Sequence, residues 1–313
     1  MTATIVRRLL SIVPVMVVVA VSVFLLVHFA PGDPAAIIAG PYATRDDLDR
    51  LRHQLGLDQP LLTRFWSWAS AVLHGDLGIS IFTNLPVTQL IGQRVGPTLS
   101  LASCTLVVAV LVAVPMGVIA AWKAGRLIDR LVMVFSVAGF SIPVFVLAYL
   151  LIYLFAIDLD WLPVQGYTPL RDGLWPWLSH LILPSIALGT IYIALIARIT
   201  RAAMLDVLAQ DYVRTAHAKG LAPGAVLMRH ALKNAAVPIV TIIGIGVALL
   251  ISGVVVTESV FAIPGIGRLT VDAIIRRDYP IIQGVILIFS AVYVLVNLAV
   301  DLSYRLFDPR IQY

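Results

Sequence analysis

Six long runs of apolar residues constrain this chain more than any other feature of its sequence. A helix that crosses about 30 Å of hydrocarbon needs about 20 mostly apolar residues, because each residue adds about 1.5 Å along the axis. Runs of this kind lie at about residues 9–30, 99–122, 131–157, 178–197, 235–257 and 280–300. None shows the ten-residue alternation of a membrane β-barrel. The sequence therefore predicts an all-α membrane protein with six transmembrane helices.

The composition agrees with a membrane protein. Of the 313 residues, 60% are hydrophobic and 12% are charged, whereas soluble domains carry about 25% charged residues. A water-facing surface cannot cover such an excess of apolar side chains. This excludes a disordered chain and disfavours an ordinary soluble enzyme.

The first apolar run follows Arg7 and Arg8, as the apolar region of a signal peptide would. It is longer than the roughly 7–15 residues of such a region, and no small-x-small cleavage site follows it before Pro31. We therefore expect it to be a retained helix.

The charges segregate between the two sides of the membrane. With the N-terminus in the cytoplasm and six spans, both termini are cytoplasmic. Thirteen of the 22 Lys and Arg residues, but only five of the 17 Asp and Glu residues, then lie on the cytoplasmic side. This fits the positive-inside rule. The net charge of +5 is thus an insertion signal and does not indicate nucleic-acid binding.

The chain lacks the residues of an energy-coupling site. A phosphate-binding P-loop needs Lys followed by Ser or Thr. The three lysines, Lys123, Lys219 and Lys233, are instead followed by Ala, Gly and Asn, which excludes a standard P-loop. The lone Cys104 allows neither an intrachain disulfide nor a cysteine metal site.

The apolar runs contain few ionisable groups, and those present lie near the ends. Interfacial or capping roles are expected for His28, His180, Arg198, Glu258 and Asp301. A Ser252–His180 pair would be needed for an intramembrane protease, but Ser252 and Gly253 are better explained by helix packing. The six helices therefore form a passive pathway that another chain must power, or else a passive channel or secondary carrier.

The segment of residues 31–97 is the longer connection on the outer side. Thr44 and Asp47 form a capping-box pattern that predicts a helix ending at Gly56. Pro60 opens a second predicted helix, which Gly75 ends. We expect a small helical periplasmic segment between the first two spans.

The segment of residues 198–237 is the long cytoplasmic connection. Apolar residues at helical spacing run to Ala216, Gly220 stops the helix, and Pro223 starts another. The first helix is slim and basic. It could enter a groove in another protein, or it could lie on anionic lipid headgroups.

The motif Arg214-Thr215-Ala216-x-x-x-Gly220 resembles the EAA loop of ABC importer permeases, in the form found in the dipeptide, oligopeptide and nickel subfamily. Further blocks similar to this subfamily, and to its B-type subunit, occur in order at residues 31–34, 55–60, 75–80, 229–235, 264–268, 277–280 and 308–310. The resemblance therefore covers nearly the whole chain.

This resemblance implies a type I ABC importer permease in the bacterial inner membrane, which is not an enzyme. Its implied partners are a second homologous permease, two ATPase subunits that bind ATP and Mg, and a periplasmic solute-binding protein. Small peptides are the implied substrates, with glutathione, nickel complexes or other small solutes as alternatives. The ATPase-coupling residues are expected to be Arg214, Thr215, Ala216, Ala218, Lys219, Gly220, Arg229 and His230.

Small residues near the fifth span are candidates for the gate or the pathway: Gly244, Gly246, Ser252, Gly253, Pro264, Gly265 and Gly267. The alternatives are close helix packing for the first four and a plain outer loop for the others. We expect boundaries at 1–30 for the first span, 31–97 for the periplasmic segment, 98–301 for the permease core and 302–313 for a cytoplasmic tail.

Two positions depart from the subfamily pattern. Ala222-Pro223 replaces a Ser or Thr cap, which could alter how the second helix of the loop is held. Ile263 replaces an aromatic residue on the outer side.

Overall fold

The computed structural model describes residues 2–29, 34–39, 43–54 and 58–307, and these are almost entirely helical. They form two compact units. The N-terminal unit comprises Met1–Val95 and Leu269–Val292, and the core unit comprises Gly96–Arg268 and Tyr293–Tyr313. The motif blocks at 31–34, 55–60 and 308–310 lie wholly or partly outside the described residues.

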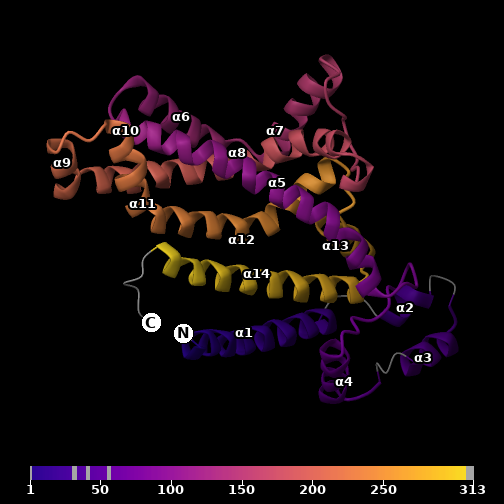
Figure 1. Cartoon of the computed structure of the whole chain (residues 1–313). Coiled ribbons are helices and arrows are strands. Elements are labelled where there is room, and N and C mark those ends of the chain that lie inside the picture. Colours follow the sequence, from indigo (N-terminus) through magenta and orange to yellow (C-terminus); the bar gives the residue numbers. More distant parts are fainter. Residues whose placement is uncertain (1, 30–33, 40–42, 55–57, 308–313) are drawn as a thin grey trace. The chain divides into compact units, whose positions relative to one another are not determined.

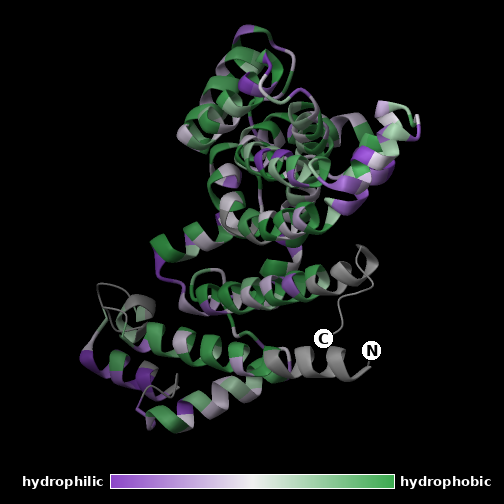
Figure 2. Ribbon diagram, turned by 90° about the vertical axis from the view of Figure 1, so that its left-hand side faces the viewer, coloured by the Kyte–Doolittle hydropathy of each residue, from purple (hydrophilic) through white to green (hydrophobic). Residues whose placement is uncertain are grey.

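The core unit is built around α8 (Leu174–Leu208). Helices α6 (Leu127–Ser141), α7 (Val144–Leu151) and α12 (Ala236–Val260) pack against α8. Buried side chains such as Leu181, Leu188 and Ile196 line α8 over much of its length. Figure 2 shows that hydrophobic residues dominate the long helices.

Two glycines allow the neighbouring helices to approach α8 closely. A Cβ on Gly117 in α5 (Val87–Trp122) would lie 2.6 Å from the carbonyl oxygen of Ala197, and one on Gly139 in α6 would lie 3.0 Å from the Cβ of Ala194. Small residues give membrane helices the backbone contact on which their packing depends.

Four described helices are long and apolar enough to span a membrane: α1 (Thr2–Phe29), α5, α8 and α14 (Tyr279–Phe307). Two bent pairs raise the number to six if each pair is one span. This agrees with the six runs predicted from the sequence.

The third predicted run is broken, which the apolar pattern alone did not predict. Helix α6 ends before Ile142, whose φ and ψ are −90° and 119°. Helix α7 and the π-helix η1 (Ile152–Asp158) continue at a bend of 103°. The cause is Pro143, because proline disfavours helical backbone at the residue before it.

The N-terminal unit contains α1, α2 (Pro34–Ala39), α3 (Arg45–Gln54) and α4 (Leu61–Leu73). The capping box of α3 is confirmed: the Thr44 hydroxyl donates to the Asp47 carboxylate at 2.6 Å, and the Asp47 N–H donates back to the hydroxyl at 3.3 Å. The Thr44 hydroxyl and the Thr44 N–H, at 3.1 Å, both donate to the Asp47 carboxylate and lower its pKa. Helix α4 begins after Pro60, as predicted, and Gly75 adopts a φ of 83° beyond its end. The predicted stop at Gly56 lies outside the described residues.

Two of the motif blocks meet inside this unit. Asp278, which precedes α14, is buried and accepts a hydrogen bond from the Ser80 hydroxyl at 2.6 Å. It also accepts one from the Ile81 N–H at 3.3 Å. The blocks at 75–80 and 277–280 are therefore the two halves of one structural contact.

Candidate functional site

The connection between α8 and α12 forms the predicted helix, turn and helix. Helix α9 (Asp211–Ala218) follows α8, and α10 (Pro223–Ala225) begins the return to α12. In Figure 1, α9 lies at one tip of the core unit, where α8 ends. We call residues 211–234 the elbow, with α9 as one arm and the segment from α10 to α11 (Leu232–Asn234) as the other.

Gly220 ends α9 through a Schellman motif. Its N–H donates to the carbonyl of His217 at 2.9 Å, and the N–H of Leu221 donates to that of Ala216 at 3.3 Å. These bonds require a left-handed residue between them, and Gly220 has a φ of 78°. The geometry confirms that Gly220 is the stop of this helix.

A small apolar cluster holds the inner face of α9. Val213 and Ala216 are buried against Val226, with Leu208 and Leu221 packed around them. The small side chain of Ala216 lets α9 lie close to the returning segment. Ala216 is thus the one predicted coupling residue of the elbow that does not reach its surface.

The outer face of α9 is exposed and basic. The side chains or backbone of Arg214, Thr215, Ala218, Lys219 and Gly220 are all exposed. The ion pair between Arg214 and Asp211, at 3.7 Å, lies on the exposed surface.

The returning segment contains a π-helix that sequence reasoning missed. Residues Val226–Ala231 form η3 between α10 and α11 (Leu232–Asn234). Arg229 is exposed there and His230 is half-buried. The departure at Ala222 has a structural counterpart, because Ala222 provides no side-chain cap for α10. Apolar periodicity cannot distinguish a turn of π-helix from one of α-helix, so no signal was available.

An amide clamp joins the two arms of the elbow. The Asn234 side-chain N–H group donates to the Tyr212 hydroxyl at 2.8 Å and to the His230 carbonyl at 2.8 Å. The bond to Tyr212 links α9 to the segment at 229–235, and the bond to His230 lies within that segment.

An ion pair ties α8 to the start of α6 on the same side of the core unit. The guanidinium of Arg201 makes two hydrogen bonds to the carboxylate of Asp129, and the bond from Nη2 is 2.8 Å long. Asp129 is buried and also accepts the Gly125 N–H at 2.9 Å. The sequence predicted both charges on the cytoplasmic side but not their pairing.

We expect Asp129→Ala to destabilise the protein by about 2 kcal/mol, because the partly buried Arg201 loses two charge-assisted hydrogen bonds. The measurement is the thermal unfolding midpoint of the detergent-purified protein. Asp211→Ala is the matched control, since its ion pair with Arg214 is fully exposed and such pairs contribute little. Equal midpoints for the two variants would show that the Asp129 pair has no structural role.

The predicted gate motif forms a tight corner between α12 and α13 (Ile266–Arg276). The buried carboxylate of Glu258 accepts the Thr98 hydroxyl at 2.6 Å and the Arg268 N–H at 3.0 Å. The Thr98 oxygen accepts the Ile266 N–H at 2.8 Å. Glu258 therefore has the predicted capping role, and Thr98 is a partner that sequence reasoning missed.

The glycines of this corner make room for the carboxylate. A Cβ on Gly265 would overlap the Glu258 carboxylate, and one on Gly267 would lie 2.6 Å from the Cα of Val255. Pro264 precedes them, and Ile263 is fully buried in the core. Three of the predicted gate residues thus belong to one hydrogen-bonded corner.

The glycines inside α12 lie at helix contacts. A Cβ on Gly253 would lie 2.8 Å from Leu188 on α8, and one on Gly246 would lie 3.6 Å from Tyr192. A Cβ on Gly244 would overlap Val300 of α14. These contacts favour the packing interpretation over exposed pathway backbone. The side chain of Ser252 lies outside the described residues.

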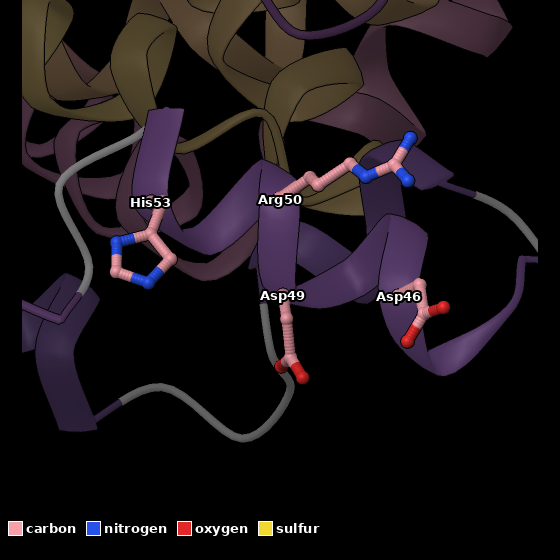
Figure 3. A pocket seen from close by; sticks show the side chains of 4 residues that line it. All are labelled: Asp46, Asp49, Arg50 and His53. Carbon is pink, nitrogen blue, oxygen red and sulfur yellow. The ribbon is translucent and has the colours of Figure 1, made fainter.

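No cluster of three or more potential metal ligands occurs among the described residues. A shallow depression on α3 is lined by Asp46, Asp49, Arg50 and His53 (Figure 3). It contains both charge signs, and His53 and Asp49 contact Asp58 and Arg52 respectively. The depression is therefore part of a solvated, internally paired surface.

Two protein families match the chain. Residues 113–313 match the family described as binding-protein-dependent transport system inner membrane component. Residues 1–102 match its N-terminal companion, described as a membrane component of the same transport systems. The two matches together cover almost the whole chain.

Individual relatives match over their full length. The chain is 57% identical over 309 residues to a probable peptide ABC transporter permease protein, y4tP, of Sinorhizobium fredii, with 99% of each chain covered. It is 45% identical to the glutathione transport system permease protein GsiC of Escherichia coli strain K12, covering 99% of this chain and 98% of that one.

A solved structure shares the fold. A chain of the inward-facing MetNI methionine ABC transporter aligns with a TM-score of 0.58 at 18% identity, covering 70% of this chain and 97% of that chain. The fold is therefore that of a type I ABC importer permease, as predicted.

Proposed function

This chain belongs to the family of binding-protein-dependent transport system inner membrane components, and we propose that it forms half of the translocation pathway of an ATP-driven importer. Members of this family are transport subunits rather than enzymes, and they work with ATPase and substrate-binding partners. The chain is accordingly a multi-pass membrane protein whose energy comes from other subunits.

The main support for this proposal is the exposed elbow, which would couple this chain to an ATPase. Its outer face is basic and accessible, while its inner face is fixed by the apolar cluster around Val213 and by the Asn234 clamp. A rigid exposed element transmits a displacement, whereas a flexible one absorbs it. We place α9 in a groove of an ATPase subunit, which binds ATP and Mg. Closure of the ATPases then moves α9. Helices α8 and α12, which flank the elbow in the chain, transmit this movement to the membrane spans.

The substrate we propose is a small peptide. One relative is named as a peptide permease and another as a glutathione permease, and glutathione is itself a tripeptide. The subfamily resemblance also implies nickel complexes or other small solutes as alternative substrates. In this arrangement the binding protein selects the solute, so the permease contributes little of the selectivity.

The proposed assembly contains a second, homologous permease as a heterodimer partner, two ATPases and a periplasmic binding protein. Both termini of this chain are placed in the cytoplasm, which puts the basic elbow on the ATPase side. The α12–α13 corner then lies on the periplasmic side, where an outer gate is required.

The proposal is tested in proteoliposomes with labelled dipeptide and labelled glutathione as probes. Uptake is expected only when the chain is reconstituted with its partner permease and ATPases, with ATP inside and binding protein outside. The chain alone is expected to move neither probe. A matched control carries an ATPase subunit whose P-loop lysine is replaced. Uptake by the isolated chain down a gradient would identify a passive channel or carrier instead.

A further inference from the structure

Helix α4 of the N-terminal unit is attached to the first span through aromatic rings. Phe24 of α1 contacts Phe65 of α4, with ring centroids 5.3 Å apart, and also Trp68, at 5.7 Å. Figure 1 shows α4 at the C-terminal end of α1. The position of α4 along α1 is therefore fixed by these side chains.

A second apolar stripe on α4 faces away from the Phe24 contact. Leu62, Trp66 and Leu73 share one face of the helix, because their spacings of four and seven residues are close to whole turns. They are 73%, 68% and 86% exposed. Thr63 and Ser67, which are also exposed, lie beside this stripe, about 80° and 120° around the helix from it.

The depth of α4 follows from the position of Phe24. Phe24 lies five residues before Phe29, the last residue of α1, so the contact is about 7.5 Å inside the end of that helix. Interfacial amphipathic helices lie about 5–10 Å into the boundary between headgroups and acyl chains. Tryptophan is also enriched at this level of the membrane.

Both α1 and α4 expose apolar side chains beyond their mutual contact. Val18, Leu25 and Leu26 of α1 are exposed, and these side chains belong to a helix that spans the bilayer. Arg64, the only charged residue of α4, lies on the side opposite the Leu62 stripe. Every other residue of α4 is apolar or a small hydroxyl, which suits contact with acyl chains.

We propose that α4 is a monotopic interfacial helix that inserts Leu62, Trp66 and Leu73 into the bilayer leaflet at the C-terminal end of α1. The occupant of the stripe is lipid, namely the acyl chains just below the headgroups. The helix anchors the segment between the first two spans to the membrane surface. This role does not depend on which solute is carried.

The test uses single cysteines in the full-length chain, in nanodiscs of phosphatidylethanolamine and phosphatidylglycerol. Cys104 is the chain's one cysteine, so Cys104→Ser provides the background. Spin labels are placed by Leu62→Cys, Trp66→Cys and Leu73→Cys on the stripe, and by Thr63→Cys and Ser67→Cys as matched controls on the polar face that flanks it, which we call the control face. Collisions with oxygen, which dissolves in lipid, and with a water-soluble nickel chelate are measured by electron paramagnetic resonance.

Labels on the stripe are expected to collide more with oxygen than with the nickel chelate, and labels on the control face more with the chelate. Brominated lipids provide a second measurement, since they should quench a fluorophore at Leu62→Cys and not one at Ser67→Cys. Equal chelate access on both faces would overturn the proposal by placing the stripe in water. Protection of the stripe from both reagents would overturn it by assigning the stripe to a protein partner.

Discussion

The Gly220→Val variant is expected to reach the membrane at the normal level and to lose substrate uptake by at least about tenfold. Gly220 has a φ of 78°, a conformation that costs a residue with a side chain about 1–2 kcal/mol and a β-branched one more. A Cβ there would meet no atom within 4 Å. The cost is therefore confined to the backbone of the turn, and the spans remain intact while α9 loses its fixed end. Uptake of labelled peptide and the amount of inserted protein are measured together.

Two further variants distinguish backbone strain in the turn from the added volume of the valine side chain. Gly224→Val adds the same side chain in the same elbow, also in open space but at an ordinary φ, and should transport normally. Gly220→Asn should retain much of the activity, because asparagine tolerates the left-handed conformation. Normal uptake by Gly220→Val at normal expression would remove Gly220 from the coupling mechanism. A matching loss in Gly224→Val would attribute the effect to surface bulk.

The second large effect is expected from Gly265→Ala, which should lower the stability of the protein by about 3 kcal/mol or more. The added Cβ would overlap the buried Glu258 carboxylate, and overpacking together with lost hydrogen bonds to a charged group gives this magnitude. The carboxylate would have to leave Thr98 and the Arg268 N–H. The thermal midpoint and the yield of monodisperse protein are the measurements.

Gly246→Ala is the matched control, because its Cβ would lie at an ordinary 3.6 Å from Tyr192. A double-mutant cycle identifies the cause. In a Glu258→Ala background the overlap with the carboxylate is gone, so Gly265→Ala should cost much less than in the wild type. Additive effects would show that the clash with Glu258 is not the reason that glycine is needed at this corner.

Several local features were predictable because their causes lie within a few residues. The Thr44–Asp47 capping box involves groups three residues apart, and the structure has it as predicted. The Gly220 stop is a property of one residue and the helix before it. The break at Pro143 could have been predicted from the same kind of local rule. It was missed because the apolar run of residues 131–157 continues through the proline without interruption.

The long-range partners could not be predicted in this way. Glu258 was expected to have an interfacial or capping role, but its link to Thr98 spans 160 positions. Arg201 and Asp129 are 72 residues apart. Their pairing depends on how the helices pack against one another, and neither residue type nor spacing contains that information.

The sequence alone determined that the chain is a helical membrane protein without its own P-loop, and where the elbow turns. Those conclusions follow from hydrophobic length, from the absence of a residue pattern and from local backbone preference. Only the tertiary structure decided that Ala216 faces inward, that the Gly265 corner closes on a carboxylate, and that α4 exposes a second apolar stripe beside the first span. Each of these depends on contacts between segments distant in the chain, because burial is a property of neighbours in space.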